Sequence, residues 1–224
     1  LVERDALAGQ LVRAGKLSAL GELAAVLAHE LRNPLASILG SAEALAAEFP
    51  ADHRKHRLGQ LMLREIDRLD RVVADFLEFA RPAPPTRQRT DMRALLEEVV
   101  GLARHHRDAD EVRFDIEMDP GELELEVDPD QMTQVLLNLT LNATQALSED
   151  EAPEAPTITY LARERDVGAR RRRCLGVRDN GPGVDPEHLE EIFHPYFTTR
   201  PEGSGLGLSL SARMIEAHGG FLDV

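Results

Sequence analysis

The chain has 224 residues, of which 42% are hydrophobic and 29% are charged, an ordinary balance for one or two folded domains. Its 26 Lys and Arg residues against 40 Asp and Glu residues give a formal net charge of −14, which argues against nucleic-acid binding through phosphate contacts and against attachment to an anionic membrane surface. The single cysteine, Cys174, excludes an internal disulfide and favours a reducing cytoplasmic setting. Because no apolar run reaches the ~18 residues that span a bilayer, any membrane attachment is expected only through an upstream region that precedes Leu1.

Two segments with heptad spacing open the chain. A helix is predicted from about residue 7 to 47, in which apolar or small residues follow alternating steps of three and four over 17–45, and Pro34 is expected to bend this helix. A second stripe runs over 62–80, after a break at 49–52. A hairpin with apolar stripes on both helices cannot bury them alone, so the pattern predicts a homodimer that forms a four-helix bundle, with an intramolecular coiled-coil spacer as the alternative.

One histidine of the first helix lies off the apolar stripe. With Ala24 at heptad position a and Leu27 at position d, His29 falls at f, which is farthest from a partner helix, and Glu30 is its neighbour. By itself, such a residue is most simply a surface histidine, and the rest of the chain is needed to favour a chemical role.

The periodicity changes after a proline cluster at 81–85, which predicts the end of the second helix and a semi-stiff linker. Asp91 is expected to cap a helix that ends near His105. The remaining pattern predicts an α/β sandwich with helices on one face of a sheet: strands at 112–116, 123–127, 157–161 and 174–177, and helices at 129–147 and from about 205 to 219. The basic run 170–173 is expected to be a solvated hairpin loop.

Three amide side chains share one face of the predicted 129–147 helix: Gln134, Asn138 and Asn142 are spaced four residues apart. An asparagine carbonyl is a hard oxygen ligand that suits Mg²⁺ bound to substrate phosphates, although any one of these amides could instead bond to nearby backbone. The turn at 179–183 ends a strand with a carboxylate and two glycines, and the glycines at 203–207 open the last helix, where backbone N–H groups suit a phosphate. The chain has no Gly-Lys-Ser or Gly-Lys-Thr, so a P-loop is excluded.

Taken together, five segments resemble the histidine, asparagine, first glycine, phenylalanine and second glycine boxes of two-component sensor histidine kinases, in the order found in that family: 29–34, 138–143, 179–183, 193–200 and 203–208. The phenylalanine box resembles that of the nitrogen-regulatory branch. The resemblance implies an α+β protein of two domains, in which a dimerisation and phosphoacceptor hairpin precedes a catalytic domain of the Bergerat (GHKL) ATPase type.

The same resemblance implies roles for individual residues. His29 is the expected phosphoacceptor, Glu30 the residue that orients its proton, and Asn33 a residue that positions water in a phosphatase reaction. ATP and Mg²⁺ are the expected cofactors, with Asn142 as the metal ligand, Asn138 near the phosphates and Asp179 at the adenine amino group. The other expected nucleotide-binding residues are Gly181, Gly183, Thr198, Thr199, Arg200, Gly203, Gly205, Leu206 and Gly207. The expected protein partner is the receiver domain of a response regulator.

The implied organisation is an input helix at 1–16, the phosphoacceptor domain at 17–81, a linker at 82–89 and the catalytic domain at 90–224. The strand pair that ends the sheet in this family, after the position of Gly220, is expected to be missing from this sequence. A nucleotide-binding scaffold without catalysis, a pseudokinase, is the rival hypothesis. An ATPase of the chaperone or topoisomerase type does not explain the helical hairpin.

Overall fold

The computed structural model describes residues 31, 34–50, 53–80, 83–106, 109, 111–119, 123–148, 153–167, 170–200 and 203–224. The chain divides into two compact units, Leu1–Ala83 and Pro84–Val224. The predicted phosphoacceptor residues His29, Glu30 and Asn33 lie outside the described residues.

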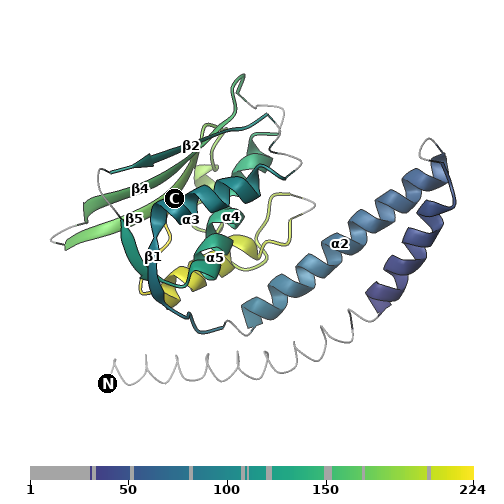
Figure 1. Ribbon diagram of the computed structural model, residues 1–224, viewed down its shortest axis with the longest axis horizontal. Coiled ribbons are helices and arrows are strands. Elements are labelled where there is room, and N and C mark those ends of the chain that lie inside the picture. Colours follow the sequence, from purple (N-terminus) through teal and green to yellow (C-terminus); the bar gives the residue numbers. More distant parts are fainter. Residues whose placement is uncertain are drawn as a thin grey trace. The chain divides into compact units, whose positions relative to one another are not determined.

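The first unit is a helical hairpin (Figure 1), in which a helix over 34–47 lies beside α2, Arg54–Ala80. The two helices pack closely near the turn that joins them, since a Cβ on Gly59 would come within 2.8 Å of the Ala46 Cβ. His56 Nδ1 lies 2.8 Å from the Ala46 carbonyl oxygen and 3.2 Å from that of Phe49, so its N–H serves acceptors at the end of the first helix. The predicted hairpin is confirmed for these residues.

The second unit contains a mixed three-stranded sheet in the order β2-β4-β5, in which β2 is parallel to β4 and β4 is antiparallel to β5. These strands are β2 (Arg113–Met118), β4 (Thr157–Val167) and β5 (Arg170–Asp179). A separate antiparallel pair joins β1 (Gln88–Asp91) to β3 (Glu124–Val127).

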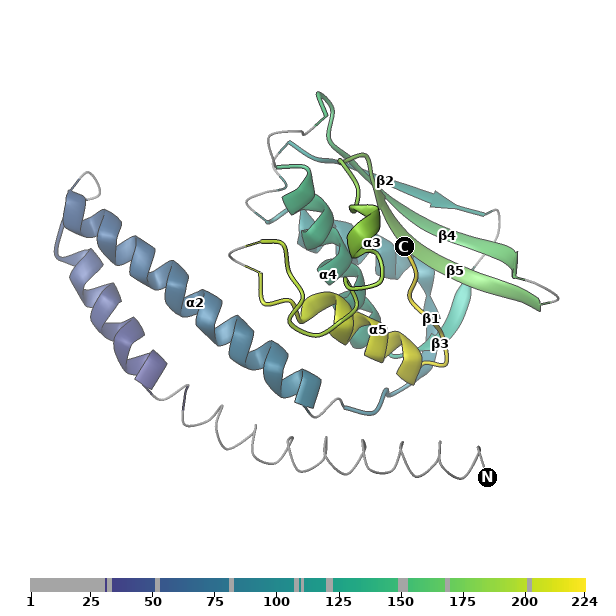
Figure 2. The same cartoon turned by 180° about the vertical axis from the view of Figure 1, so that it is seen from behind.

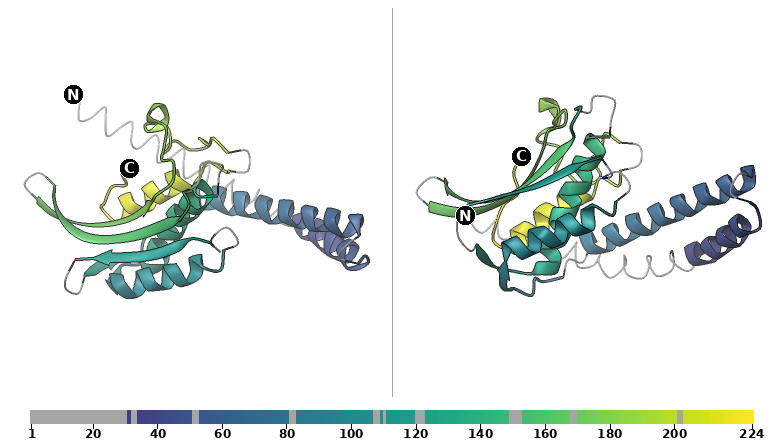
Figure 3. Two further views of the ribbon diagram at one scale, coloured as in Figure 1. Left: turned by 90° about the horizontal axis from the view of Figure 1, so that it is seen from above. Right: turned by 45° about the horizontal axis from the view of Figure 1, so that its top comes forward.

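Three helices cover one face of the three-stranded sheet (Figures 1 and 3): α3 (Met92–Ala103), α4 (Pro129–Ala146) and α5 (Gly207–Ala217). The central helix α4 contacts both of the others (Figure 2). Alternate residues of β4, namely Ile158, Tyr160 and Ala162, are almost fully buried beneath the helices. The predicted sandwich with helices on one sheet face is confirmed.

Local capping explains where these helices begin. Asp91 accepts a hydrogen bond from the Arg93 N–H at the start of α3, and Asp128 accepts from Asp130 and Gln131 at the start of α4. At the other end of the unit, α5 stops at Gly219, whose φ of 81° is a left-handed conformation that glycine adopts at little cost. The capping role predicted for Asp91 is confirmed.

Two local expectations differ from the structure. β1 lies at a stretch, Gln-Arg-Thr-Asp, that has no apolar alternation, and it is a strand because β3 pairs with it along its whole length. The expected hairpin loop at 170–173 is wrong, because these residues continue β5 and pair with β4 as far as Val167. One arginine of this run is paired across the strands, since Arg173 Nε lies 3.6 Å from Glu164 Oε1.

In the ranges given above, no helix is both long enough and apolar enough to cross a membrane.

Candidate nucleotide site

The amide face of α4 lies against the beginning of α5. Asn138 donates from Nδ2 to the Gly207 carbonyl oxygen at 3.0 Å and to Ser211 Oγ at 3.3 Å. A Cβ on Gly207 would come within 3.1 Å of the Asn138 side chain, so the small residue permits this close approach. Asn138 therefore holds the first turn of α5 against the middle of α4.

One turn further along α4, the side chain of Asn142 is half-buried and makes no hydrogen bond to the described residues. Below it, Thr140 is fully buried, and its hydroxyl donates to the Leu136 carbonyl oxygen and accepts from the Tyr160 hydroxyl at 2.8 Å. Burial raises the pKa of Tyr160, which keeps this hydroxyl protonated. The bond to Tyr160 thus fixes the side of α4 that faces β4, and the Asn142 amide oxygen remains available as a ligand.

The turn after β5 packs onto the end of α4. Asp179 Oδ1 accepts from the Gly181 N–H at 2.9 Å. A Cβ on Gly181 would lie 2.9 Å from that oxygen and 3.5 Å from Leu147 Cδ2, so a larger residue would displace the turn. Asn180 accepts from the Thr157 N–H at 2.8 Å and donates to the Ala155 carbonyl oxygen at 3.0 Å, which joins the end of β5 to the start of β4.

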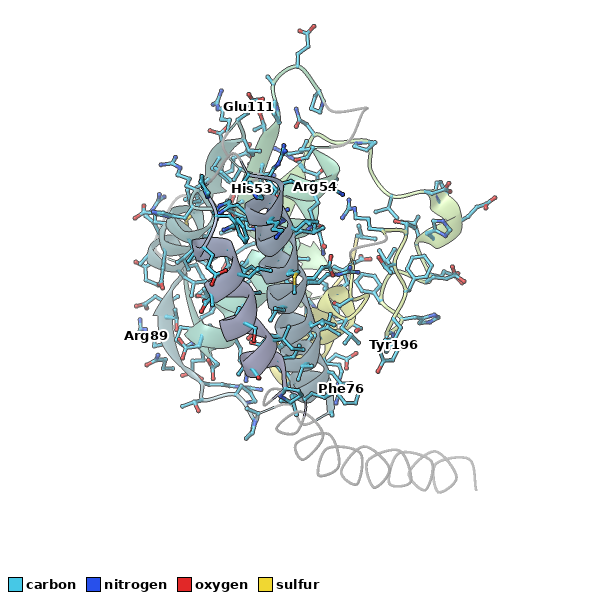
Figure 4. The ribbon with its side chains drawn as sticks, turned by 90° about the vertical axis from the view of Figure 1, so that its right-hand side faces the viewer. His53, Arg54, Phe76, Arg89, Glu111 and Tyr196 are labelled. Atoms are coloured by element: carbon cyan, nitrogen blue, oxygen red, sulfur yellow. The ribbon has the colours of Figure 1, made fainter. Side chains whose placement is uncertain are left out.

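The segment between the 3₁₀ turn η2 (Pro186–His188) and α5 is here called the lid loop, residues 189–206. Within this loop, the Tyr196 N–H donates to the Gly205 carbonyl oxygen at 2.8 Å, which closes the part of the loop between these two residues. Tyr196 has a φ of 69°, unusual for a residue other than glycine, and its side chain is 61% exposed (Figure 4). Gly205, with a φ of 66°, lies so close to Tyr196 that no side chain fits.

The middle of the lid loop is a turn held by its own side chains. Thr198 Oγ accepts from the Arg200 N–H at 3.1 Å, and the Gly203 N–H donates to the Arg200 carbonyl oxygen at 3.2 Å. The Arg200 guanidinium donates to Gln145 Oε1 at 3.2 Å, which joins this turn to α4. Thr199, in the same turn, is exposed and takes part in none of these bonds. Gly183, which precedes the lid loop, has a φ of 83° and open space where a Cβ would lie.

The first turn of α5 has no side-chain cap: Leu206 at its N-cap is buried and cannot accept from the helix N–H groups. These donors and the positive end of the helix dipole suit an anionic group.

The second half of α4 therefore contacts each of the other predicted nucleotide segments: Asn138 contacts α5, Gln145 contacts the lid loop, and the end of the helix contacts Gly181. Gln145 and Ser211 were not among the site residues expected from the sequence, and Tyr196 was expected only as part of the 193–200 segment. Gln145 follows Asn142 by three residues on the same helix face, so its position was open to prediction, whereas only the folded structure brings Ser211 to Asn138.

The donor set fits a magnesium–nucleotide complex better than a metal bound by protein alone. Among the described residues, no group of three or more His, Cys, Asp or Glu side chains is arranged to hold a metal ion. Mg²⁺ often keeps most of its waters and is bound through one protein oxygen and substrate phosphates. The half-buried amide of Asn142 suits that role, with the uncapped start of α5 for the phosphates.

At the opposite ends of α4 and α5, a second polar cluster joins both helices to the chain that enters this unit. Thr86 donates its N–H to Asp128 Oδ2 at 2.7 Å, and the Asp128 N–H donates to His218 Nε2 at 3.0 Å. Burial acts to raise the pKa of Asp128, but the hydrogen bonds that its carboxylate accepts from the N–H groups of Thr86, Gln131 and Asp130 lower that pKa below its ordinary value.

Comparison with known families agrees with this arrangement. Residues 19–85 match the His Kinase A (phospho-acceptor) domain, and residues 127–224 match the histidine kinase-, DNA gyrase B- and HSP90-like ATPase. The chain is 39% identical over its full length to the sensor histidine kinase ZraS of Escherichia coli K12, and 33% identical over 98% of its length to the sensory histidine kinase/phosphatase NtrB of Rhizobium meliloti. It covers 46% and 58% of these two proteins, and so spans about half the length of the curated relatives it matches.

Solved structures show the same likeness. A full-length ShkA crystallised with AMPPNP matches 88% of this chain at a TM-score of 0.69 and 28% identity, over 41% of its own length. The histidine kinase ThkA, crystallised with the response regulator TrrA, matches 93% of this chain at a TM-score of 0.62 and 29% identity, over 58% of its own length.

Proposed function

Because the chain belongs to the sensor histidine kinases, we propose that it phosphorylates its own His29 with ATP and passes the phosphoryl group to an aspartate of a response regulator. The proposed phosphoacceptor domain is 17–81, the linker 82–89 and the catalytic domain 90–224. The observation that carries the proposal is that the other three nucleotide segments all contact α4, which contains the fourth, and the Asn138–Gly207 bond of 3.0 Å is the clearest of these contacts.

In the catalytic domain, Asn142 supplies the protein oxygen for Mg²⁺, and Asp179 accepts a hydrogen bond from the adenine amino group. When bound, Mg²⁺ neutralises charge on the phosphates. The N–H groups of Gly205 and Gly207 and the guanidinium of Arg200 provide further positive potential around them. Since phosphoryl transfer asks mainly for positioning and charge neutralisation, this set requires no additional catalytic side chain.

In the transfer step, a ring nitrogen of His29 attacks the γ-phosphorus, the bond to the β–γ bridging oxygen breaks, and ADP leaves. Glu30 holds the proton on the other ring nitrogen, so that the attacking nitrogen carries a lone pair. The phosphoryl group then moves to the partner aspartate. The co-crystal of ThkA with the response regulator TrrA supports a partner of this class.

A second activity is proposed for the same helix. Glu30 and Asn33 follow the Glu-x-x-Asn pattern that the resemblance links to dephosphorylation of the partner, and one relative, NtrB, is named a kinase/phosphatase. The pseudokinase hypothesis finds no support, because the relatives given above are named kinases.

The hairpin is proposed to form a homodimer, which would bury an apolar face that one copy leaves exposed. Seven large apolar residues of the hairpin are each 38% to 50% exposed to solvent. Three belong to the first helical segment and four to α2: Leu31, Ile38 and Leu45, and Leu58, Leu61, Met62 and Leu69. A cytoplasmic location for this part of the protein, with membrane attachment only through an upstream region, stays a prediction.

The decisive experiment is incubation of the chain with γ-labelled ATP and Mg²⁺, beside a His29→Gln variant. The expected result is a label that is acid-labile and alkali-stable, as a phosphohistidine is, and that is absent from His29→Gln. His53→Gln is the matched control, because His53 is an exposed histidine at the hairpin turn and should keep the label.

The outcomes separate the parts of the proposal. Label that persists in His29→Gln would overturn the assignment of the phosphoacceptor. Binding of ATP without any label on the unaltered chain would overturn the kinase proposal and favour the pseudokinase.

A further inference from the structure

We propose that the lead-in segment, residues 84–87, controls how tightly the catalytic unit binds nucleotide, through the bond from Thr86 to Asp128 at the start of α4, which in turn is bonded to His218 at the end of α5. Thr86, Asp128 and His218 are then positioning residues, since none of them belongs to the segments that converge on the nucleotide site. This inference rests on the proposed ATP-binding function.

The lead-in segment is bonded to both nucleotide helices. Asp128, the N-cap of α4, accepts at Oδ2 from the Thr86 N–H at 2.7 Å, and at Oδ1 from the first turn of α4. The Arg87 guanidinium donates to the Ala217 carbonyl oxygen at 2.7 Å, at the negative end of α5. A displacement of residues 86–87 therefore acts on the start of one helix and the end of the other.

The His218 ring joins the end of α5 to the start of α4 through one donating and one accepting nitrogen. Its Nδ1 lies 2.7 Å from the Met214 carbonyl oxygen, which can only accept, so this nitrogen carries the proton. Nε2 is consequently an acceptor, and it receives the Asp128 N–H at 3.0 Å. Each ring nitrogen thus has one partner, the first on α5 and the second at the cap of α4.

The two helices are joined at two levels. The far level is Asp128–His218, and the near level is Asn138 with Gly207 and Ser211. Ten residues of α4 separate them, about 15 Å at the helical rise. Because the helices are rigid over that length, the far level fixes the angle at which the first turn of α5, with its phosphate-binding N–H groups, faces Asn142.

Loss of the far level leaves Asn138 to supply the polar contacts given above between α4 and α5, at the beginning of α5. Shifts of 1–2 Å are the usual scale of helix movements in switching proteins, and a misplacement of about 1 Å at a site can cost up to 10²-fold in rate. The lead-in segment directly follows the boundary between the two compact units, so any change in the path of the chain there reaches the nucleotide site through these bonds.

Two matched pairs of variants test the inference in the full chain. Thr86→Pro deletes the N–H that Asp128 accepts, whereas Thr86→Ala keeps it. His218→Asn retains a donor near the position of Nδ1 but has no acceptor at the reach of Nε2, whereas His218→Gln can present an amide oxygen there. The measurements are the Kd for Mg²⁺–AMPPNP, the autophosphorylation rate at saturating ATP, and the melting temperature.

Thr86→Pro and His218→Asn are expected to raise the Kd roughly 3- to 10-fold, the scale of one lost hydrogen bond, while Thr86→Ala and His218→Gln stay within about twofold of the unaltered chain. Equal Kd values in all four variants, whatever their melting temperatures, would overturn the inference and leave these residues a purely structural role. Failure of the unaltered chain to bind AMPPNP would instead overturn the proposed function, so the two failures are distinguishable.

Discussion

At position 205 the backbone leaves room for glycine alone. Gly205 has a φ of 66°, and a Cβ there would come within 2.5 Å of the Tyr196 carbonyl carbon and 2.8 Å of the Phe197 oxygen. Gly219 offers a comparison, because its φ of 81° is equally left-handed but its surroundings are open. The first glycine closes the lid loop, and the second ends α5 at the far side from the nucleotide segments.

Gly205→Ala should therefore raise the Kd for Mg²⁺–AMPPNP by about tenfold or more, because the overlap must displace the lid loop and the first turn of α5. Gly219→Ala should lose roughly 1–2 kcal/mol of unfolding free energy from backbone strain, with little change in that Kd. Nucleotide titration and urea unfolding measure the two effects. Equal Kd values for the two variants would show that the lid loop tolerates the displacement.

At the scale of an element, the start of α2 has unfavourable electrostatics. Arg54, Lys55 and Arg57 occupy the beginning of this helix, whose first turn has no acidic residue. His53 and Arg54 are labelled at this end of the hairpin in Figure 4. The N-terminus of a helix carries a partial positive charge, so these cations destabilise it, although Lys55 gains a contact 4.8 Å above the Phe49 ring.

Arg54→Glu is expected to increase the unfolding free energy of the hairpin by roughly 0.3–1 kcal/mol, because it replaces a repulsive charge by an attractive one at the helix start. Urea unfolding followed by helical circular dichroism measures it, and 1 M salt should reduce the gain. Arg64→Glu is the control, since Arg64 is also exposed but lies in the middle of α2. A gain of equal size in the control would assign the effect to net charge rather than to the helix dipole.

At the scale of the whole molecule, the exposed apolar side chains of the hairpin contrast with those of the second unit. In the hairpin they recur along both helices, whereas Leu102 of α3 is 47% exposed with its neighbours Gly101 and Arg104 also at the surface. A stripe of this kind is expected to bind the same stripe of a second copy. In the resulting symmetric dimer, each of these residues is buried once in each copy.

Leu69→Glu should weaken the homodimer roughly 100- to 10,000-fold, since burial of one leucine contributes about 1.5–3 kcal/mol and the symmetric interface loses two. Sedimentation equilibrium measures the dissociation constant. Leu102→Glu, at a side chain of nearly equal exposure (47% against 48% for Leu69), should leave the dimer unchanged. A monomeric unaltered chain would contradict the proposed dimer.

The sequence alone was enough to predict features that depend on neighbours along the chain. Helical spacing predicts α2 and α4, the aspartate at position 91 predicts the start of α3, and the glycines at 219 and 220 predict the end of α5. The family motifs predict the nucleotide segments in their order. The assignments of His29, Glu30 and Asn33 stay predictions, because these residues lie outside the described part of the chain.

Contacts between distant residues were decided only by the tertiary structure. β1 is a strand because β3 pairs with it, the arginines at 170–173 extend β5 because β4 lies beside them, and Arg200 bonds to Gln145 across 55 positions of sequence. The same holds for the bond from Thr86 to Asp128. The physical reason is that helix periodicity and capping act within one or two turns, whereas strand pairing and side-chain hydrogen bonds depend on which segments the fold places side by side.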